Sequence, residues 1–81
     1  MPSNATREKI SSNVARLLRQ ERERKNLSLN ALAAKAGISR QMVSYVEQEE
    51  RNPSLDTLLR IADALEIALD DVIKKARAAS R

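Results

Sequence analysis

Almost every large apolar side chain in this chain of 81 residues is aliphatic, and this restricts the folds that can bury a core. The chain has ten Leu, five Ile and four Val, but Tyr45 is its only aromatic residue. Together with twelve Ala, this composition favours closely packed helices over a sheet. One Gly and two Pro also leave few strong turn formers for hairpins. We therefore predict an all-α fold that forms a single domain over residues 1–81.

The residue types that are missing exclude several kinds of chemistry. The chain contains no Cys and no His, so it lacks a thiol nucleophile, a disulfide and the main ligands of zinc sites. It also lacks the commonest general base. No apolar run approaches the ~18 residues that a membrane span needs, and the N-terminus has no apolar segment typical of a signal peptide. We expect a cytoplasmic protein that is not an enzyme, holds no cofactor or metal and does not bind membranes.

The charges are distributed unevenly along the chain. Residues 1–46 carry a net charge of +6, residues 47–69 a net charge of −4, and residues 70–81 a net charge of +2. A basic half joined to an acidic half favours a protein with one face turned toward a polyanion. Ordinary solvated helix surfaces are the alternative explanation of the charge pattern.

Apolar residues recur at helical spacing in five segments of the chain. Ile10, Val14 and Leu17 mark the first helix, which we expect over about residues 6–25. The same pattern predicts helices over about residues 29–35, 39–48, 54–65 and 69–78. A serine that can cap a helix stands at the start of three of them: Ser28, Ser39 and Ser54. We expect the fourth helix to have a broad apolar side formed by Leu55, Leu58, Leu59, Ile61, Ala62 and Leu65.

Residues 28–47 have the spacing of a helix-turn-helix motif. Ala33 is small at the point where the two helices cross, and Gly37 makes the turn between them. Larger apolar residues set the angle between the two helices: Leu32, Ile38, Val43 and Val46. The size and spacing of these residues predict the motif, although short helical pairs of this kind also occur in proteins that do not bind DNA.

The outer side of the second helix of this motif carries hydrogen-bonding side chains: Arg40, Gln41, Ser44 and Tyr45. No acidic residue precedes Glu47 in this helix. A surface that is laid against double-stranded DNA requires donors and acceptors of this kind. The pattern therefore favours a helix that contacts DNA bases.

Three segments support a more specific interpretation by their order and separation: RQERERKNLSL, AGISRQMVSYVE and ERNPSLDTLLRIADAL. Over about residues 10–75 the chain resembles the Cro/phage-repressor-like helix-turn-helix family, also called the XRE family. The resemblance implies a compact five-helix domain of the lambda-repressor type, encoded by a bacterium or phage, that regulates transcription. Its third helix would enter the major groove of double-stranded DNA. Small members of the family include phage repressors, Cro-like proteins and the controller proteins of restriction–modification systems.

The resemblance also implies roles for individual side chains. Four residues would contact bases: Arg40, Gln41, Ser44 and Tyr45. Arginine can bind the O6 and N7 atoms of guanine, and glutamine can bind the N6 and N7 atoms of adenine. Contacts to phosphate groups or to the minor groove would come from Ser28, Asn30, Ser39, Arg51 and Asn52. Arg22 would form a structural ion pair with Glu47.

Three positions depart from the family pattern. Leu29 stands where the family commonly has a glutamine that binds phosphate. Glu49 stands where a glycine usually ends the third helix, which predicts a strained or differently capped turn. Glu50 adds acidic charge near the expected DNA edge, and we expect it to weaken non-specific affinity.

A domain of this size offers few contacts to DNA, and specific binding commonly combines two half-sites. We therefore expect a homodimer that binds a near-palindromic operator, without a small-molecule effector. One set of apolar residues completes the core of the domain, forms the dimer interface, or does both: Leu65, Ile67, Leu69, Val72 and Ile73. The alternative function is an antitoxin or another protein-interaction module of a toxin–antitoxin system.

Overall fold

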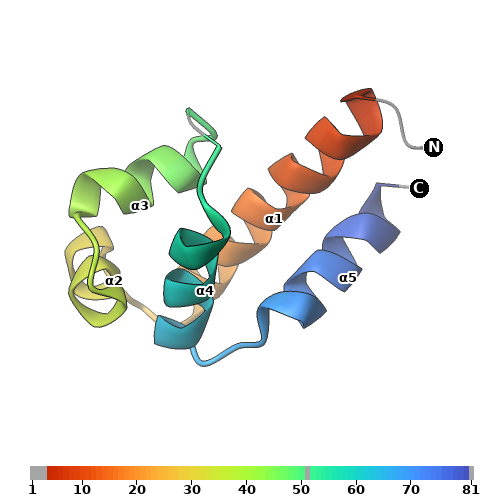
Figure 1. The fold of residues 1–81 in the computed structure, drawn as a ribbon. Coiled ribbons are helices and arrows are strands. Elements are labelled where there is room, and N and C mark those ends of the chain that lie inside the picture. The colour runs from red at the N-terminus through yellow and green to blue at the C-terminus, as the bar shows by residue number, and fades with distance from the viewer. Residues whose placement is uncertain (1–3, 51, 81) are drawn as a thin grey trace.

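The computed structural model describes residues 4–50 and 52–80, and this part of the chain forms five helices (Figure 1). They are α1 (Asn4–Arg24), α2 (Leu29–Ala36), α3 (Arg40–Glu47), α4 (Leu55–Ala64) and α5 (Leu69–Ala79). Neither described range contains a strand. The predicted all-α, five-helix fold is confirmed, and each helix ends within two residues of its expected bounds.

Hydrogen bonds to serine explain where three of the helices begin. The side-chain oxygens of Ser28, Ser39 and Ser54 each accept the backbone N–H of the residue three positions later, at 3.0 Å. Each bond satisfies a donor that the first turn of a helix leaves without an intrahelical partner. Helix α5 begins differently, because Ala68 at its N-cap makes no side-chain hydrogen bond and two acidic residues lie in the first turn instead.

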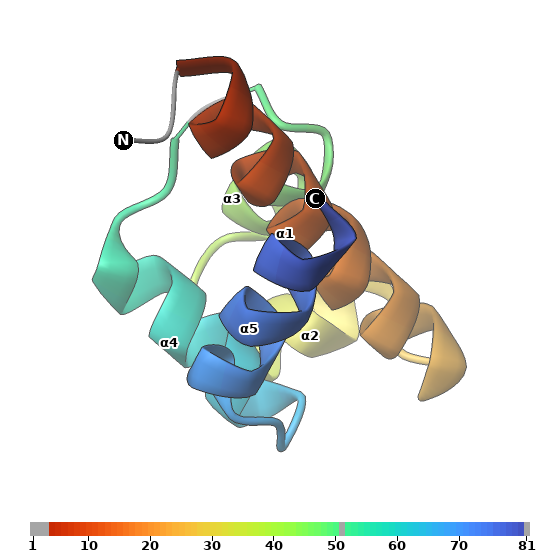
Figure 2. The ribbon, with the colours of Figure 1, turned by 90° about the vertical axis from the view of Figure 1, so that its right-hand side faces the viewer.

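Helices α1 and α5 pack side by side in antiparallel directions (Figures 1 and 2). The start of α1 and the end of α5 therefore lie at the same end of the molecule, which measures 37 × 21 × 18 Å. Helix α2 packs against α3 and α4 toward the other end, and α1 also contacts α3. Helices α2 and α3 are thus held by the rest of the domain rather than by each other alone.

The core lies where the helices meet. Its largest fully buried side chains are Leu18, Leu32, Val43, Ile61 and Leu65. Truncation of one buried Leu or Ile to Ala typically costs ~2–5 kcal/mol of unfolding free energy. Because α1, α2, α3 and α4 all contribute to this core, it fixes the position of α3 relative to the other helices.

The residues that we considered for self-association mostly lie inside the domain. Leu65 is 0% exposed, and Leu69 and Val72 are each 6% exposed. Ile67 and Ile73 are partly buried against the same core. These side chains complete the core of the domain, which was one of the two interpretations. Leu65, Leu69 and Val72 expose too little surface to contact a second copy of the chain.

The domain covers only part of the apolar side of α4. Leu55 is 63% exposed and Leu59 is 43% exposed, whereas Ile61 and Ala62 are buried. The domain therefore buries only part of the apolar side that the spacing predicted. Leu58 alone among the three leucines of this helix packs against the core. The spacing shows that a helix side is apolar, but not how much of that side its neighbours cover.

Candidate nucleic-acid interface

The turn between α2 and α3 depends on Gly37. Its backbone has φ 69°, and its N–H donates to the carbonyl oxygen of Ala33. Only glycine adopts this left-handed conformation without a steric penalty. A Cβ atom placed there would also lie 3.3 Å from Nη1 of Arg60. The helix-turn-helix geometry that the spacing predicted over residues 28–47 is present in the structure.

Helix α3 is held at both of its ends. Ser39 caps the start, and the carbonyl oxygen of Tyr45 accepts the backbone N–H of Glu50 at 3.0 Å beyond the end. Glu49 adopts φ 60°, so a non-glycine residue occupies the left-handed position that usually favours glycine. Ser12 of α1 also donates a hydrogen bond to the Glu49 carboxylate. The turn thus has an unusual cap residue, and its side chain is tied to α1.

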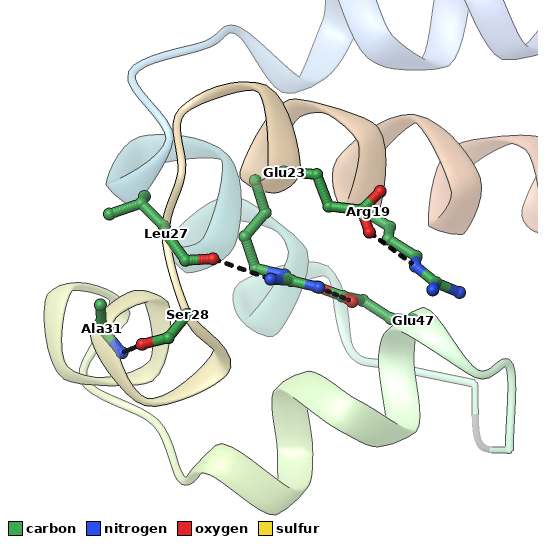
Figure 3. Close-up of polar contacts among 7 residues, drawn as sticks. Arg19, Glu23, Leu27, Ser28, Ala31 and Glu47 are labelled. Atoms are coloured by element: carbon green, nitrogen blue, oxygen red, sulfur yellow. Dashed lines mark hydrogen bonds and ion pairs between the residues drawn. The ribbon is translucent and has the colours of Figure 1, made fainter.

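A largely buried ion pair fastens the end of α3 to α1. Nε of Arg22 lies 2.7 Å from Oε2 of Glu47, and Nη2 lies 3.0 Å from Oε1. Nη1 of Arg22 donates to the carbonyl oxygen of Leu27 at 2.7 Å, and Figure 3 draws the contacts at Leu27 and Glu47. The Arg22 and Glu47 side chains are only 13% and 7% exposed. The hydrogen bond to Glu47 raises the pKa of Arg22, so the guanidinium group stays charged.

This ion pair differs from the exposed one beside it. Nε of Arg19 lies 3.6 Å from Oε2 of Glu23, one turn further along α1, and both side chains are more than half exposed (Figure 3). An exposed pair of this kind contributes little to stability. The Arg22–Glu47 pair implied by the family resemblance is therefore the contact that orients α3 in this region.

The solvent side of α3 brings together the four predicted base-contacting residues. Val43 and Val46 are buried, whereas Arg40 and Gln41 are exposed and Ser44 and Tyr45 are half-buried. This face has no carboxylate, since Glu47 is turned toward α1 and bound to Arg22. It offers a cation, an amide and two hydroxyl groups on one short rigid helix, which suits hydrogen bonding to base edges.

The residues predicted to contact phosphate are less uniformly placed. Ser28 and Ser39 cap α2 and α3, so their oxygens accept backbone N–H groups while each hydroxyl hydrogen remains a donor. Asn30 is exposed in the first turn of α2, and Asn52 is exposed in the connection before α4. Arg51 lies outside the described residues. The phosphate and minor-groove contacts of this group stay predictions.

Sequence reasoning did not identify several contacts from α1 to distant elements. Nδ2 of Asn13 donates to the carbonyl oxygen of Ala76 at 3.2 Å, and Lys25 donates to that of Leu65 at the end of α4. Neither contact has a local sequence signal, because each joins residues far apart in the chain. Both stabilise the packing that supports α3 rather than its exposed face.

An open hollow of about 750 Å³ lies between the first half of α1, the connection before α4, and α5. Its apolar lining includes Ile10, Val14, Leu58 and Ile73. Among residues 4–50 and 52–80 no cluster of three acidic, His or Cys side chains has the arrangement of a metal site. Within the same ranges, no helix combines the length and apolar content needed to cross a membrane.

Comparison with known proteins places this geometry in a family. Residues 18–72 match the family described as Helix-turn-helix. This match covers all of α2, α3 and α4 and extends into α1 and α5. The chain belongs to the helix-turn-helix family, of the Cro/phage-repressor-like type that the sequence resembles.

The curated relatives are named as transcriptional regulators. The chain is 37% identical over 62 residues to the uncharacterized regulator y4dJ of Sinorhizobium fredii, covering 76% of this chain and 75% of that protein. It is 33% identical over 60 residues to SlrR of Bacillus subtilis, covering 73% of this chain and 40% of SlrR. The matches span 38% to 41% of SlrR and of three other curated relatives.

A solved structure is similar over nearly all of its own length. The restriction–modification controller protein C.AhdI from Aeromonas hydrophila is 35% identical, with a TM-score of 0.71. The match covers 78% of this chain and 94% of C.AhdI. The fold that the two chains share therefore makes up nearly all of C.AhdI.

Proposed function

We propose that this protein is a sequence-specific regulator of transcription that inserts α3 into the major groove of double-stranded DNA. The observation that supports this function best is the two-sided character of α3. Val43 and Val46 fix one side in the core, and Arg22 holds Glu47 away from the other side. The remaining side is solvent-facing and presents a cation and neutral hydrogen-bonding groups at one rigid surface.

In this proposal Arg40 binds guanine and Gln41 binds adenine, each through two hydrogen bonds to the base edge. Ser44 lies one turn further along α3 and contacts a neighbouring base, and the aromatic ring of Tyr45 contacts a thymine methyl group. Ser28, Asn30, Ser39, Arg51 and Asn52 bind phosphate groups or the adjacent minor groove. The protein acts in the cytoplasm of a bacterium. The names of its relatives, which include transcriptional regulators and a restriction–modification controller, support this function.

We further infer that the protein acts as a homodimer on a near-palindromic operator, with its two α3 helices about 34 Å apart. Leu55 and Leu59 supply exposed apolar surface on α4 for a second copy.

The dimer is tested by Leu59→Asp, with sedimentation velocity as the measurement. We expect this variant to sediment as a monomer at concentrations where the unchanged protein is a dimer, and to keep its helical circular dichroism. The matched control is Ala78→Asp, an exposed position at the far end of α5. An unchanged dimer in the Leu59→Asp variant would exclude α4 as the interface.

The DNA-binding function is tested by selection of bound duplexes from a random pool. We expect the unchanged protein to enrich a site with two inverted half-sites. The readout gives half-site sequence, spacing and symmetry together. If no sequence is enriched over the starting pool, the protein is not a sequence-specific DNA-binding protein.

A further inference from the structure

Gln41 and Tyr45 are bonded to each other on the exposed face of α3. Nε2 of Gln41 donates to the hydroxyl oxygen of Tyr45 at 2.5 Å. The two residues are four positions apart, so they are neighbours on the helix surface. The contact joins two of the four residues on the solvent side of the helix. A long flexible side chain is thus held by a stiffer aromatic one.

The backbone beneath this pair is rigid. Ser39 caps the helix two residues before Gln41, and the carbonyl oxygen of Tyr45 accepts from Glu50 in the turn that follows α3. Tyr45 is also half-buried, whereas Gln41 is exposed. Tyrosine has fewer rotatable bonds than glutamine and loses less conformational freedom when it is fixed. The anchored residue of the pair is therefore Tyr45.

The hydrogen bond changes what Gln41 has left to offer. A glutamine amide has two N–H donors and one carbonyl acceptor. Donation of one N–H to Tyr45 leaves one N–H and the carbonyl oxygen. These are the donor and the acceptor that match the N7 acceptor and the N6 amino donor of adenine in the major groove. The contact with Tyr45 therefore uses one N–H of Gln41 and leaves the amide one donor and one acceptor for adenine.

The contact also reduces the entropic cost of binding. An unrestrained glutamine side chain loses rotamer freedom when it is fixed against a partner. If Tyr45 fixes Gln41 before DNA arrives, part of that cost is already met in folding. Preorganisation of this kind strengthens the correct base contact without adding any contact between Tyr45 and the base.

We propose that Tyr45 is a positioning residue that orients Gln41 for adenine, so that the two side chains form a single unit of base recognition. This inference rests on the proposed DNA-binding function. It assigns the Tyr45 hydroxyl a role through Gln41 and not through a phosphate group. It predicts that sequence preference at the base pair facing Gln41 depends on the hydroxyl, while preference at other base pairs does not.

The test compares four proteins by selection from one random duplex pool: the unchanged chain, Tyr45→Phe, Gln41→Ala and the double variant. Tyr45→Phe keeps the ring and removes only the hydroxyl. We expect the unchanged protein to prefer adenine at one position of each half-site. Tyr45→Phe should lower that preference by about three- to tenfold at this position alone. Gln41→Ala should abolish the preference, and the double variant should match Gln41→Ala.

Several results would overturn the inference. They are an unchanged preference in Tyr45→Phe, an equal loss of preference at every base pair, and an additional loss when the hydroxyl is removed from Gln41→Ala. A site without adenine at the position that Gln41→Ala relaxes would also overturn it. If instead the unchanged protein selects no site, the proposed function fails, and that outcome is distinct from all of these.

A measurement without DNA tests the same contact. In nuclear magnetic resonance spectra, the side-chain amide protons of Gln41 should resonate away from the values of exposed glutamines. Tyr45→Phe should return them to those values, while Gln20, exposed on α1, keeps its own. An unchanged Gln41 amide in Tyr45→Phe would show that the hydroxyl does not hold it. Thermal unfolding of Tyr45→Phe confirms that the fold is intact.

Discussion

Helices α3 and α4 both start at a capping serine and both bury one apolar side, but their exposed sides differ. On α4, Nε of Arg60 lies 2.8 Å from Oδ2 of Asp56, and this hydrogen bond raises the pKa of Arg60. On α3, no described residue forms an ion pair with Arg40, and Glu47 is bound to Arg22. The exposed cation of α4 already has a partner within its own helix. The exposed cation of α3 remains available to an external acceptor.

The difference follows from where the acidic residues stand in each helix. Asp56 lies one turn before Arg60, where an acid and a base stabilise a helix by a small amount. Helix α3 has its one acidic residue, Glu47, at its last position, seven residues after Arg40 and bound to Arg22 of α1. Arg40 thus has no acidic partner within α3, whereas Arg60 has one within α4. Helix α3 is therefore the better candidate for binding a partner that is anionic or rich in hydrogen-bond acceptors.

The largest effect that we expect is on stability, from Glu47→Ala. This variant leaves the guanidinium of Arg22 charged and only 13% exposed without its partner. Loss of one partner of a buried pair typically costs ~3–5 kcal/mol, which is a large part of the stability of a small domain. Urea unfolding followed by circular dichroism measures it. The control is Glu21→Ala, whose partner Arg24 is largely exposed, and this variant should unfold almost as the unchanged protein does.

If Glu47→Ala and Glu21→Ala were equally stable, the Arg22–Glu47 pair would not be the contact that holds the end of α3. The comparison between the two helices would then lose its structural basis, because α3 would be free to turn its carboxylate toward solvent.

A smaller and more selective effect is expected from Arg40→Ala. We expect a loss of about 1–3 kcal/mol in discrimination at one base pair, with relaxed choice at that position. Helix α3 has other base-contacting residues, so preference at the remaining positions should persist. Competition binding with duplexes that differ at single base pairs measures this. A uniform loss over all sequences would instead indicate a phosphate contact by Arg40.

The smallest effect is expected from Arg60→Gln on α4. Arg60 and Asp56 are both more than half exposed, so their pairing contributes little to stability. The variant should unfold at nearly the same temperature as the unchanged protein and should select the same DNA bases as before. Calorimetry and duplex selection check the two expectations. Altered base preference in Arg60→Gln would remove the distinction between the two exposed helix faces.

Much of the fold follows from local sequence signals. Apolar spacing and the serines at positions 28, 39 and 54 gave the helix bounds to within two residues. Gly37 marked the turn of the motif, and Glu49 marked an unusual turn after α3 that the structure shows as a left-handed residue. These features are local, because capping and left-handed backbone depend on a few neighbouring residues.

The rest depends on which side of each helix its neighbours cover. Leu55 and Leu65 belong to the same apolar pattern, but Leu55 is exposed and Leu65 is in the core. Burial of Leu69 and Val72 likewise depends on α5 lying along α1. The Gln41–Tyr45 bond is different in kind, since its spacing of four residues was visible in the sequence. Two residues that were considered separately turn out to be partners.

The contact between Arg40 and a guanine base provides the most direct test of the claim that α3 enters the major groove. In the selected operator, the guanine whose preference is lost in Arg40→Ala is replaced by 7-deazaguanine, which lacks the N7 acceptor and keeps normal base pairing. We predict that this replacement weakens binding of the unchanged protein and leaves binding of Arg40→Ala unaffected. Equal weakening of both proteins, or of neither, would contradict a major-groove contact by Arg40.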